Sequence, residues 1–323
     1  MNSQTTPDKA PLRSWLPGMV ALAAIWGFSF LFIAVGVREL HPAYVALGRV
    51  ATGALTLLVV LAVRREPLPS SPRLWGHFLV LGAVGAAVPF MLFGYGEKRI
   101  PSLLAGIWNG TTPLVVLPIA VLVFRTERFS AQRAVGLLIG FAGMLVVLGA
   151  WESGGAALSG QLMCFGAAAC YGVAIPYQKK FVASAPVSGL ALSAGFLIGA
   201  FVVLAVLAPL MAGGLPPAPW SLSAGAVASV VALGALGSGL AFVINLRNVR
   251  LVGASTASMV TYLIPVFAIG VGIVFLHEHL VWYQPVGAVV VLTGVAVSQG
   301  VFRRRGTPSA VTEKLVPAAD PVR

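Results

Sequence analysis

The sequence predicts an all-helical membrane protein of ten transmembrane helices, arranged as two inverted five-helix repeats. The first observation behind this fold class is composition. The 323 residues have a mean hydropathy of +0.94 and only 9% are charged, whereas soluble domains carry about 25% charged residues. The second is that apolar runs of about 20 residues recur along the chain, and one returns as a recognisable copy. A soluble globular protein is therefore excluded.

The elements follow from the apolar runs in chain order. A polar tail, 1–16, precedes the first run, and a basic tail, 303–323, follows the last. A Gly-rich joint, 151–159, divides the chain into a first repeat at 17–150 and a second at 160–302. The predicted spans lie at 17–37, 42–63, 74–96, 101–124, 131–150, 160–178, 187–211, 221–245, 251–276 and 282–302.

The internal copy relates Pro101–Phe129 to Gly253–Leu280. An apolar helix with a proline half-way, a Glu just beyond it and a glycine-spaced helix after that occurs in both halves. Because each unit has an odd number of spans, the second unit must enter the membrane in the opposite direction. The matching pairs are Ala105 and Ala257, Pro113 and Pro265, Glu127 and Glu278, Gly136 and Gly287, Gly143 and Gly294, and Gly149 and Gly300.

The positive charges predict the orientation. If the N-terminus is cytoplasmic, 17 of the 21 Lys and Arg residues fall on the cytoplasmic side. The positive-inside rule therefore predicts both termini in the cytoplasm and a multi-pass protein of the cytoplasmic membrane. The net charge of +12 is then explained by topology, and we expect no nucleic-acid partner. The 17 residues are Lys9, Arg13, Arg64, Arg65, Arg73, Arg125, Arg128, Arg133, Lys179, Lys180, Arg247, Arg250, Arg303, Arg304, Arg305, Lys314 and Arg323.

Short motifs recur in a fixed order along the two halves. The first half has AIWGFSF at 24–30, HP at 41–42 and LGRV at 47–50, and the second has YG at 171–172, PVF at 265–267 and HEHL at 277–280. Together they resemble two EamA domains of the drug/metabolite transporter superfamily over roughly residues 17–302. The resemblance implies a ten-helix carrier of small metabolites, often an exporter of amino acids or related compounds. The family's Gly before the terminal Glu is replaced here by Thr126 and His277.

Two polar helix faces are candidates to line a substrate site. Ser102, Gly106, Asn109 and Pro113 share one face of the fourth span, and Ala254, Ser258, Thr261 and Pro265 share the matching face of the ninth. Polar groups kept in a membrane helix usually face the bundle or a cavity, so we expect these faces to oppose each other across the pseudo-two-fold axis. The alternative is that the small residues only allow close helix packing.

Arg49 is the basic residue well inside a span. Central placement of an Arg costs about 2.5 to 3.5 kcal/mol on insertion scales, which favours a functional role such as holding a substrate carboxylate or pinning a neighbouring helix. The alternative is a side chain that snorkels to the headgroups. The remaining candidates for substrate binding are aromatic or polar residues inside spans: Trp26, Ser29, Tyr95, Trp108, Tyr171, Gln178, Ser238, Asn245 and Tyr262.

The predicted function is a secondary transporter that moves a small molecule by alternating access. A channel-like facilitator is the alternative, and an integral membrane enzyme is a less favoured one because no cluster of carboxylate, His or Cys side chains marks an active site. We expect no cofactor and no metal, since His277-Glu278-His279 lacks the spacing of a zinc helix. No Asp or Glu lies near a span centre, so energy coupling stays open. The expected partners are the lipid bilayer and the substrate, with a homodimer as one option.

Overall fold

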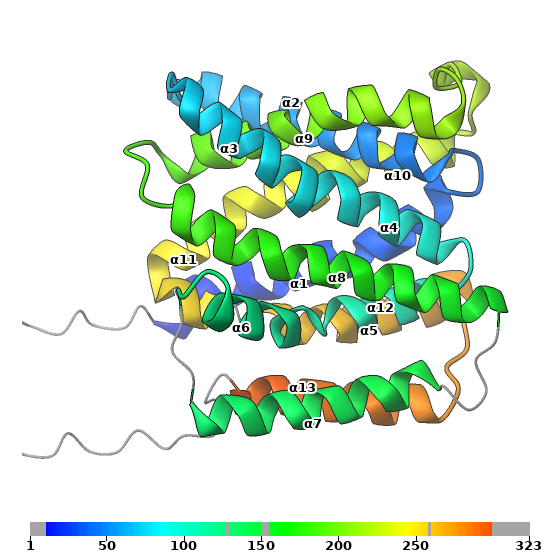
Figure 1. The fold of residues 1–323 in the computed structure, drawn as a ribbon. Helices are drawn as coiled ribbons and strands as arrows, with labels where there is room; N and C mark the ends of the chain where they lie inside the picture. Colours follow the sequence, from blue (N-terminus) through cyan, green and yellow to red (C-terminus); the bar gives the residue numbers. More distant parts are fainter. Residues whose placement is uncertain (1–10, 127–129, 150–154, 258–259, 299–323) are drawn as a thin grey trace, which may run out of the picture.

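The computed structural model describes residues 11–126, 130–149, 155–257 and 260–298, which form helices and no strand (Figure 1). Three short elements are not α-helices: η1 and η3 are π-helical, and η2 is a 3-10 turn. The elements are α1 (Leu12–Gly36), α2 (Pro42–Arg64), α3 (Pro72–Gly82), η1 (Ala83–Ala87), α4 (Val88–Glu97), α5 (Ser102–Asn109), α6 (Thr112–Leu122), α7 (Ala131–Leu148), α8 (Gly155–Phe181), α9 (Gly189–Ala212), η2 (Pro219–Ser221), α10 (Ala224–Gly234), η3 (Ala235–Leu240), α11 (Ala241–Ala257), α12 (Val260–Leu276) and α13 (Tyr283–Ser298).

The predicted fold class is confirmed. Among the described residues, eight helical stretches are long and apolar enough to cross a membrane, and α12 and α13 are shorter apolar helices. We call the end of the bundle that holds the α1–α2 connection the His41 end, and the opposite end, which holds the α2–α3 connection, the Arg65 end. In the first half α1 begins at the Arg65 end, whereas in the second half α8 begins at the His41 end (Figure 1). The two five-helix repeats are therefore inverted.

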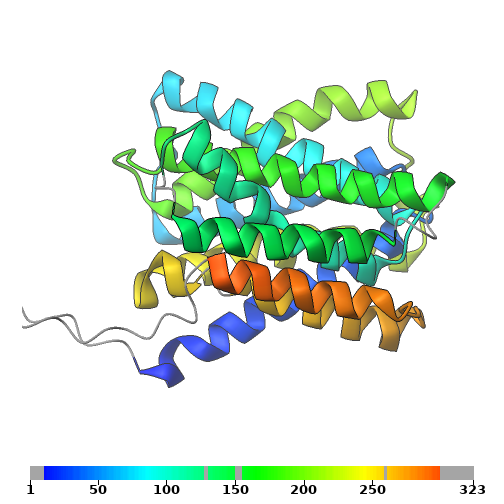
Figure 2. The same cartoon turned by 60° about the horizontal axis from the view of Figure 1, so that its bottom comes forward.

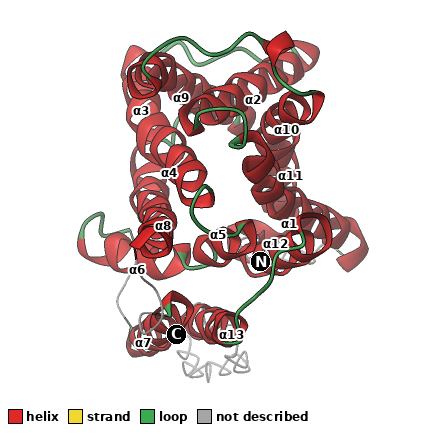
Figure 3. Cartoon of the chain, turned by 90° about the vertical axis from the view of Figure 1, so that its right-hand side faces the viewer, coloured by secondary structure: helices red, strands yellow, loops and turns green. Residues whose placement is uncertain are grey.

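The two repeats are interleaved instead of lying side by side as separate bundles. Each helix from α1 to α7 makes its most extensive described contacts with a helix of the second half. Thus α1 and α5 pack against α12, α2 and α3 against α9, and α4 and α6 against α8. Viewed along the helices, this arrangement forms a ring of helices from both halves (Figure 3). The core of the protein is consequently the interface between the repeats.

The helices α7 and α13 form an antiparallel pair at one edge of the molecule (Figure 1), which is turned towards the viewer in Figure 2. Their glycines, which the sequence shows at matching positions in the two halves, meet each other across this pair. A Cβ on Gly143 would lie 2.6 Å from the backbone nitrogen of Val291, and a Cβ on Gly287 would lie 2.6 Å from that of Val147. The helices approach this closely because glycine carries no side chain.

The predicted fourth span is divided into α5 and α6. The break falls at Gly110 and Thr111, and Pro113, which has no backbone N–H to donate, is the second residue of α6. Hydroxyl groups satisfy two carbonyls at the break: Thr111 Oγ1 donates to Trp108 and Thr112 Oγ1 donates to Asn109, each at 2.7 Å. The matching Pro265, in contrast, lies within the continuous helix α12.

Three predicted boundaries differ from the structure by several residues. The sequence predicts a break at 246–250, but α11 continues through these polar residues to Ala257. Asn248 is only 2% exposed, and it lies against Gly18 of α1, where a glycine leaves room for the polar side chain. In addition, α1 begins at Leu12, within the predicted polar tail, and α8 begins at Gly155, within the predicted joint. Tertiary contacts, which the local polarity pattern does not contain, decide the first of these differences.

Candidate functional site

The two repeats meet at a pair of matching π-helical segments. Adding 152 residues to the start of η1 at Ala83 gives Ala235, the start of η3. Single π-turns are uncommon and frequently mark functional sites, because they disturb the regular backbone hydrogen bonds. In η3, the carbonyl oxygen of Gly237 accepts a hydrogen bond of 3.1 Å from Trp26 Nε1 of α1.

Arg49 lies beside the π-helical segment η3, and its guanidinium is inside the bundle. The residue is 8% exposed, and its Nε donates a hydrogen bond of 3.1 Å to Ser238 Oγ in η3. Its Cζ lies 3.8 Å from the centre of the Phe90 ring, a cation–π contact. The sequence left two alternatives for Arg49, a role inside the bundle or snorkelling to the headgroups, and the buried side chain does not snorkel. Arg49 instead joins α2 to α4 and η3.

Ser29 and Tyr171 complete the surroundings of Arg49. Ser29 is 4% exposed and donates to the carbonyl of Ile25 at 3.1 Å, and its Oγ faces Gly237 so closely that a Cβ there would lie 2.9 Å away. Tyr171 on α8 has its ring centre 6.3 Å from that of Phe93, which lies one helical turn along α4 from Phe90, the ring that Arg49 contacts. The structure therefore gathers five predicted residues, which we call the Arg49 cluster: Trp26, Ser29, Arg49, Tyr171 and Ser238.

Two other predicted aromatic residues point to different partners. Trp108, 3% exposed, donates from Nε1 to Gln161 Oε1 of α8 at 3.2 Å, and Gln161 in turn donates to the carbonyl of Leu148 at 3.1 Å. The Tyr95 hydroxyl forms a hydrogen bond of 3.2 Å with His41 Nε2 at the His41 end. Desolvation and, secondarily, the charge of Lys98 lower the pKa of His41, which favours a neutral imidazole in this contact.

The faces predicted on the fourth and ninth spans meet in part. Along α5 and α12, a Cβ on Gly110 would lie 3.0 Å from Pro265, and Gly106 lies directly against Ala268. This is close helix packing, the alternative reading of the small residues. At the start of α5, Ser102 contacts Glu278 instead of a cavity.

The remaining predicted residues lie apart from these contacts. Asn109, Asn245, Thr261 and Tyr262 are half-buried, and the hydroxyl of Tyr262 is buried without a hydrogen-bond partner. Gln178 is exposed in the last turns of α8, towards the Arg65 end. Ser258 lies outside the described residues.

Sequence reasoning missed Phe90, Gln161 and the burial of Glu97. A signal for the first was present, because LGAVGAAVPF at 81–90 returns as LGALGSGLAF at 233–242, with each phenylalanine closing its motif. Each ten-residue motif contains one of the two π-helical segments. Gln161 and Glu97 carry no comparable signal, since their surroundings come from distant parts of the chain.

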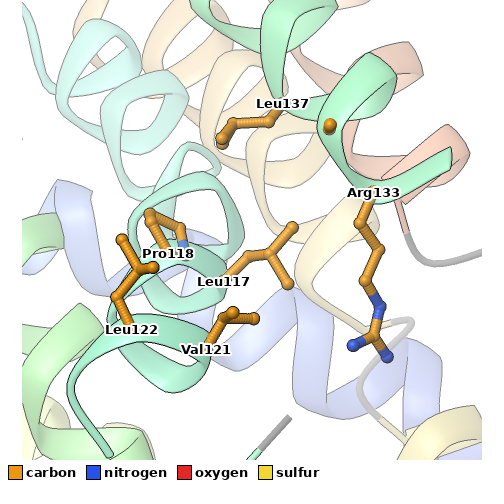
Figure 4. A pocket seen from close by; sticks show the side chains of 7 residues that line it. Leu117, Pro118, Val121, Leu122, Arg133 and Leu137 are labelled. Atoms are coloured by element: carbon orange, nitrogen blue, oxygen red, sulfur yellow. The ribbon is translucent and has the colours of Figure 1, made fainter. Parts of the chain in front are cut away.

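A separate apolar pocket lies between α6 and α7 (Figure 4). Its volume is about 140 Å³. Apart from Arg133, its lining is apolar: Leu117, Pro118, Val121, Leu122, Ala134 and Leu137. It does not include any residue of the Arg49 cluster. Within the described ranges, no group of three or more His, Cys, Asp or Glu side chains is placed to hold a metal ion.

Similar proteins carry transporter names. The chain is 24% identical to "Uncharacterized transporter YoaV" of Bacillus subtilis, over 89% of this chain and 97% of that protein. It is 28% identical to a "Probable terminal-alkyne amino-acid exporter" of Streptantibioticus cattleyicolor, over 90% and 96%. It is 25% identical to a "Probable amino-acid metabolite efflux pump" of Salmonella typhimurium, over 90% and 97%.

Comparisons of fold and of family agree with this similarity. A solved crystal structure shares the fold, with a TM-score of 0.63 and 19% identity over 91% of this chain and the whole of the other. The family description matches twice, over residues 13–149 and 158–299, once in each inverted repeat. The chain is a multi-pass membrane transporter and belongs to the EamA-like transporter family.

Proposed function

We propose that the protein exports an amino acid or a related small metabolite across the cytoplasmic membrane by alternating access. The observation that carries this proposal is the buried Arg49, because its guanidinium lies where the two inverted repeats meet. A planar guanidinium binds a carboxylate through two parallel hydrogen bonds, and Ser238 is a neutral partner that a substrate carboxylate can replace. The names of the two amino-acid exporters among the similar proteins support the substrate class.

The proposed mechanism rests on the interleaved repeats. Rocking of 17–150 against 160–302 would move Arg49 relative to Ser238, and Trp26 relative to Gly237, because each hydrogen bond joins the two repeats. The predicted orientation, with the Arg65 end in the cytoplasm, would load substrate from the cytoplasm and release it at the His41 end. Asn109, Thr261 and Ser258 belong to this proposal as residues that line the path.

The proposal is tested by efflux from proteoliposomes loaded with a mixture of the common L-amino acids, measured by mass spectrometry. We expect saturable efflux of one or a few amino acids by the wild type and its loss in Arg49→Ala. Thr293→Ala is the matched polar control, because Thr293 is exposed on α13 and bonds only its own helix at Val289. Asn109→Ala should slow efflux without altering the amount of folded protein.

Two results would count against the proposal. Efflux by Arg49→Ala at the wild-type rate would remove Arg49 from substrate binding. Steady conduction in a planar bilayer without saturation would identify a channel-like facilitator instead.

A further inference from the structure

The described part of the chain contains four carboxylate side chains, and three of them bind the N-terminal end of another helix. Glu39 accepts from the backbone nitrogen of Ser223 at 2.8 Å, directly before α10. Glu66 accepts from the hydroxyl of Ser188, directly before α9. Glu278 accepts from the backbone nitrogens of Ser102 at 2.7 Å and Leu103 at 3.0 Å in the first turn of α5. These three have a structural explanation, because helix N-termini attract anions.

Glu97, the fourth, has no such partner. It is the last residue of α4, and both of its carboxyl oxygens are buried without a hydrogen-bond partner in the described structure. An ionised carboxylate buried without a donor is strongly disfavoured, whereas the neutral acid is tolerated. The site as built therefore suits a carboxyl group that carries a proton.

The titratable groups considered around Glu97 come from α2, from α8 and from the segment after α12. Arg49 of α2 carries a charge opposite to that of an ionised Glu97, Glu278 after α12 carries the same charge, and Cys164 Sγ of α8 lies beside Gly96, the residue before Glu97. From α8, Tyr171 lies beside Phe93 of α4, with ring centres 6.3 Å apart. The helical segments α5 and η1 carry no titratable side chain, and α1 carries only Arg13, at the Arg65 end. Of these groups only Arg49 favours ionised Glu97.

Arg49 and Glu97 thus place a buried cation and a buried carboxyl group on α2 and α4, two helices that pack against each other. These are the two charges needed to receive a zwitterion, with its carboxylate on Arg49 and its ammonium group on Glu97. The next residue in the chain, Lys98, is exposed, so Glu97 lies just inside the His41 end. A small opening at this end would bring water to the carboxyl group.

We propose that Glu97 binds either a proton or the ammonium group of the substrate, and thereby couples export to proton entry. Because one carboxylate cannot hold both, arrival of a proton from the His41 end releases the substrate there. Arrival of substrate at the Arg65 end requires the O–H bond to break: both bonding electrons stay on the carboxylate, and the proton passes to water on that side. The net result is an exchange of one proton for one substrate molecule. This inference rests on the proposed export of amino acids.

The first test needs no substrate. Infrared difference spectra of the lipid-reconstituted protein between neutral and alkaline buffers should contain the carbonyl band of a protonated carboxylic acid in wild type. We expect this band to be absent in Glu97→Gln, shifted in Glu97→Asp and unchanged in Glu39→Gln, which alters a carboxylate at the same end of the bundle. Identical spectra for wild type and Glu97→Gln would overturn the proposal.

The second test imposes a pH gradient on proteoliposomes loaded with the common L-amino acids. At one proton per zwitterionic substrate the exchange moves one net charge, so the membrane potential is held at zero; acidifying the His41 side by one pH unit should then change the final distribution of the exported amino acid about tenfold in wild type. In Glu97→Gln the pH gradient should not change this distribution, and in Glu97→Asp part of the wild-type response to the gradient should remain. Gradient-driven export that survives in Glu97→Gln overturns the coupling role. A wild type that moves no amino acid refutes the proposed export, while the infrared comparison still decides whether Glu97 binds a proton.

Discussion

The Nε atom of Arg49 donates a hydrogen bond of 3.1 Å to Ser238 Oγ, and 189 residues separate the two along the chain. One partner belongs to the second helix of the first repeat, and the other to the π-helical segment of the second repeat. The length of this hydrogen bond therefore depends on the relative position of the two repeats. Because the contact uses the planar guanidinium, a Lys at this position tests whether its shape matters in addition to its charge.

Replacing Arg49 by Lys should slow transport at least tenfold while leaving the protein folded. Lys keeps the charge but loses the planar fork, the Nε donor to Ser238 and the flat contact with Phe90. Hydrogen bonds to charged groups contribute about 1.5 to 3 kcal/mol, which corresponds to roughly ten- to 150-fold. Initial efflux rates at equal reconstituted protein measure the effect. A Lys variant as fast as wild type would mean that only the charge at this position matters.

Removing the Glu278 carboxylate should destabilise the protein by about 1 to 3 kcal/mol, because the backbone donors of Ser102 and Leu103 would lose their acceptor. Thermal melting in detergent, followed by tryptophan fluorescence, measures the loss in Glu278→Ala. Hydrogen exchange should accelerate at the first turn of α5 and remain unchanged in α7. If exchange rises equally in both helices, the effect is not that of a local cap.

Adding a methyl group between α7 and α13 should destabilise the pair. In Gly143→Ala the new Cβ would lie 2.6 Å from the backbone nitrogen of Val291, so the helices must separate at a cost of about 1 to 3 kcal/mol. Gly270→Ala is the matched control in a membrane helix, because no atom lies within 4 Å of its added Cβ. The midpoint of thermal unfolding should fall for the first variant only. Equal melting of the two variants would show that the pair tolerates separation.

Stability should fall in acid through Glu39. Hydrogen bonds from the Ser223 hydroxyl and then the Ser223 backbone lower the pKa of Glu39 below its usual 4.5. The folded state thus binds this proton less readily than the unfolded state, so the contribution is complete above about pH 4.5 and is lost as the pH falls through the lower folded value. Melting temperatures measured from about pH 6 to about pH 3 should converge for wild type and Glu39→Gln. A constant difference across this range would contradict the assignment.

Much of the fold could be predicted because its signals are local. Hydropathy gives the spans one by one, and the spacing of Pro113 and Pro265 or of Gly143 and Gly294 reveals the copy without knowledge of any contact. The odd number of spans in each unit then requires inversion. The polar run at 246–250 misled the prediction of a boundary, because the burial of Asn248 against Gly18 depends on a helix more than 200 residues away.

The candidate site was predictable in its residue types and less so in its partners. Trp26, Ser29, Arg49, Tyr171 and Ser238 come together in the structure, whereas Trp108 turns to Gln161 and Gln178 lies exposed. Helical phase places a side chain on a face, but it does not say which neighbour that face meets. Which residues bind substrate stays a prediction until the variants are measured.

The sequence by itself determined the membrane class, the helices and the inverted repeat, since each follows from side-chain hydropathy and spacing along one chain. Only the tertiary structure decided that Arg49 is held by Ser238 and that Glu97, alone among the four described carboxylates, is buried without a partner. The physical reason is that the stability of a buried charge depends on the hydrogen-bond donors and acceptors around it, and for Arg49 the partner comes from the other repeat.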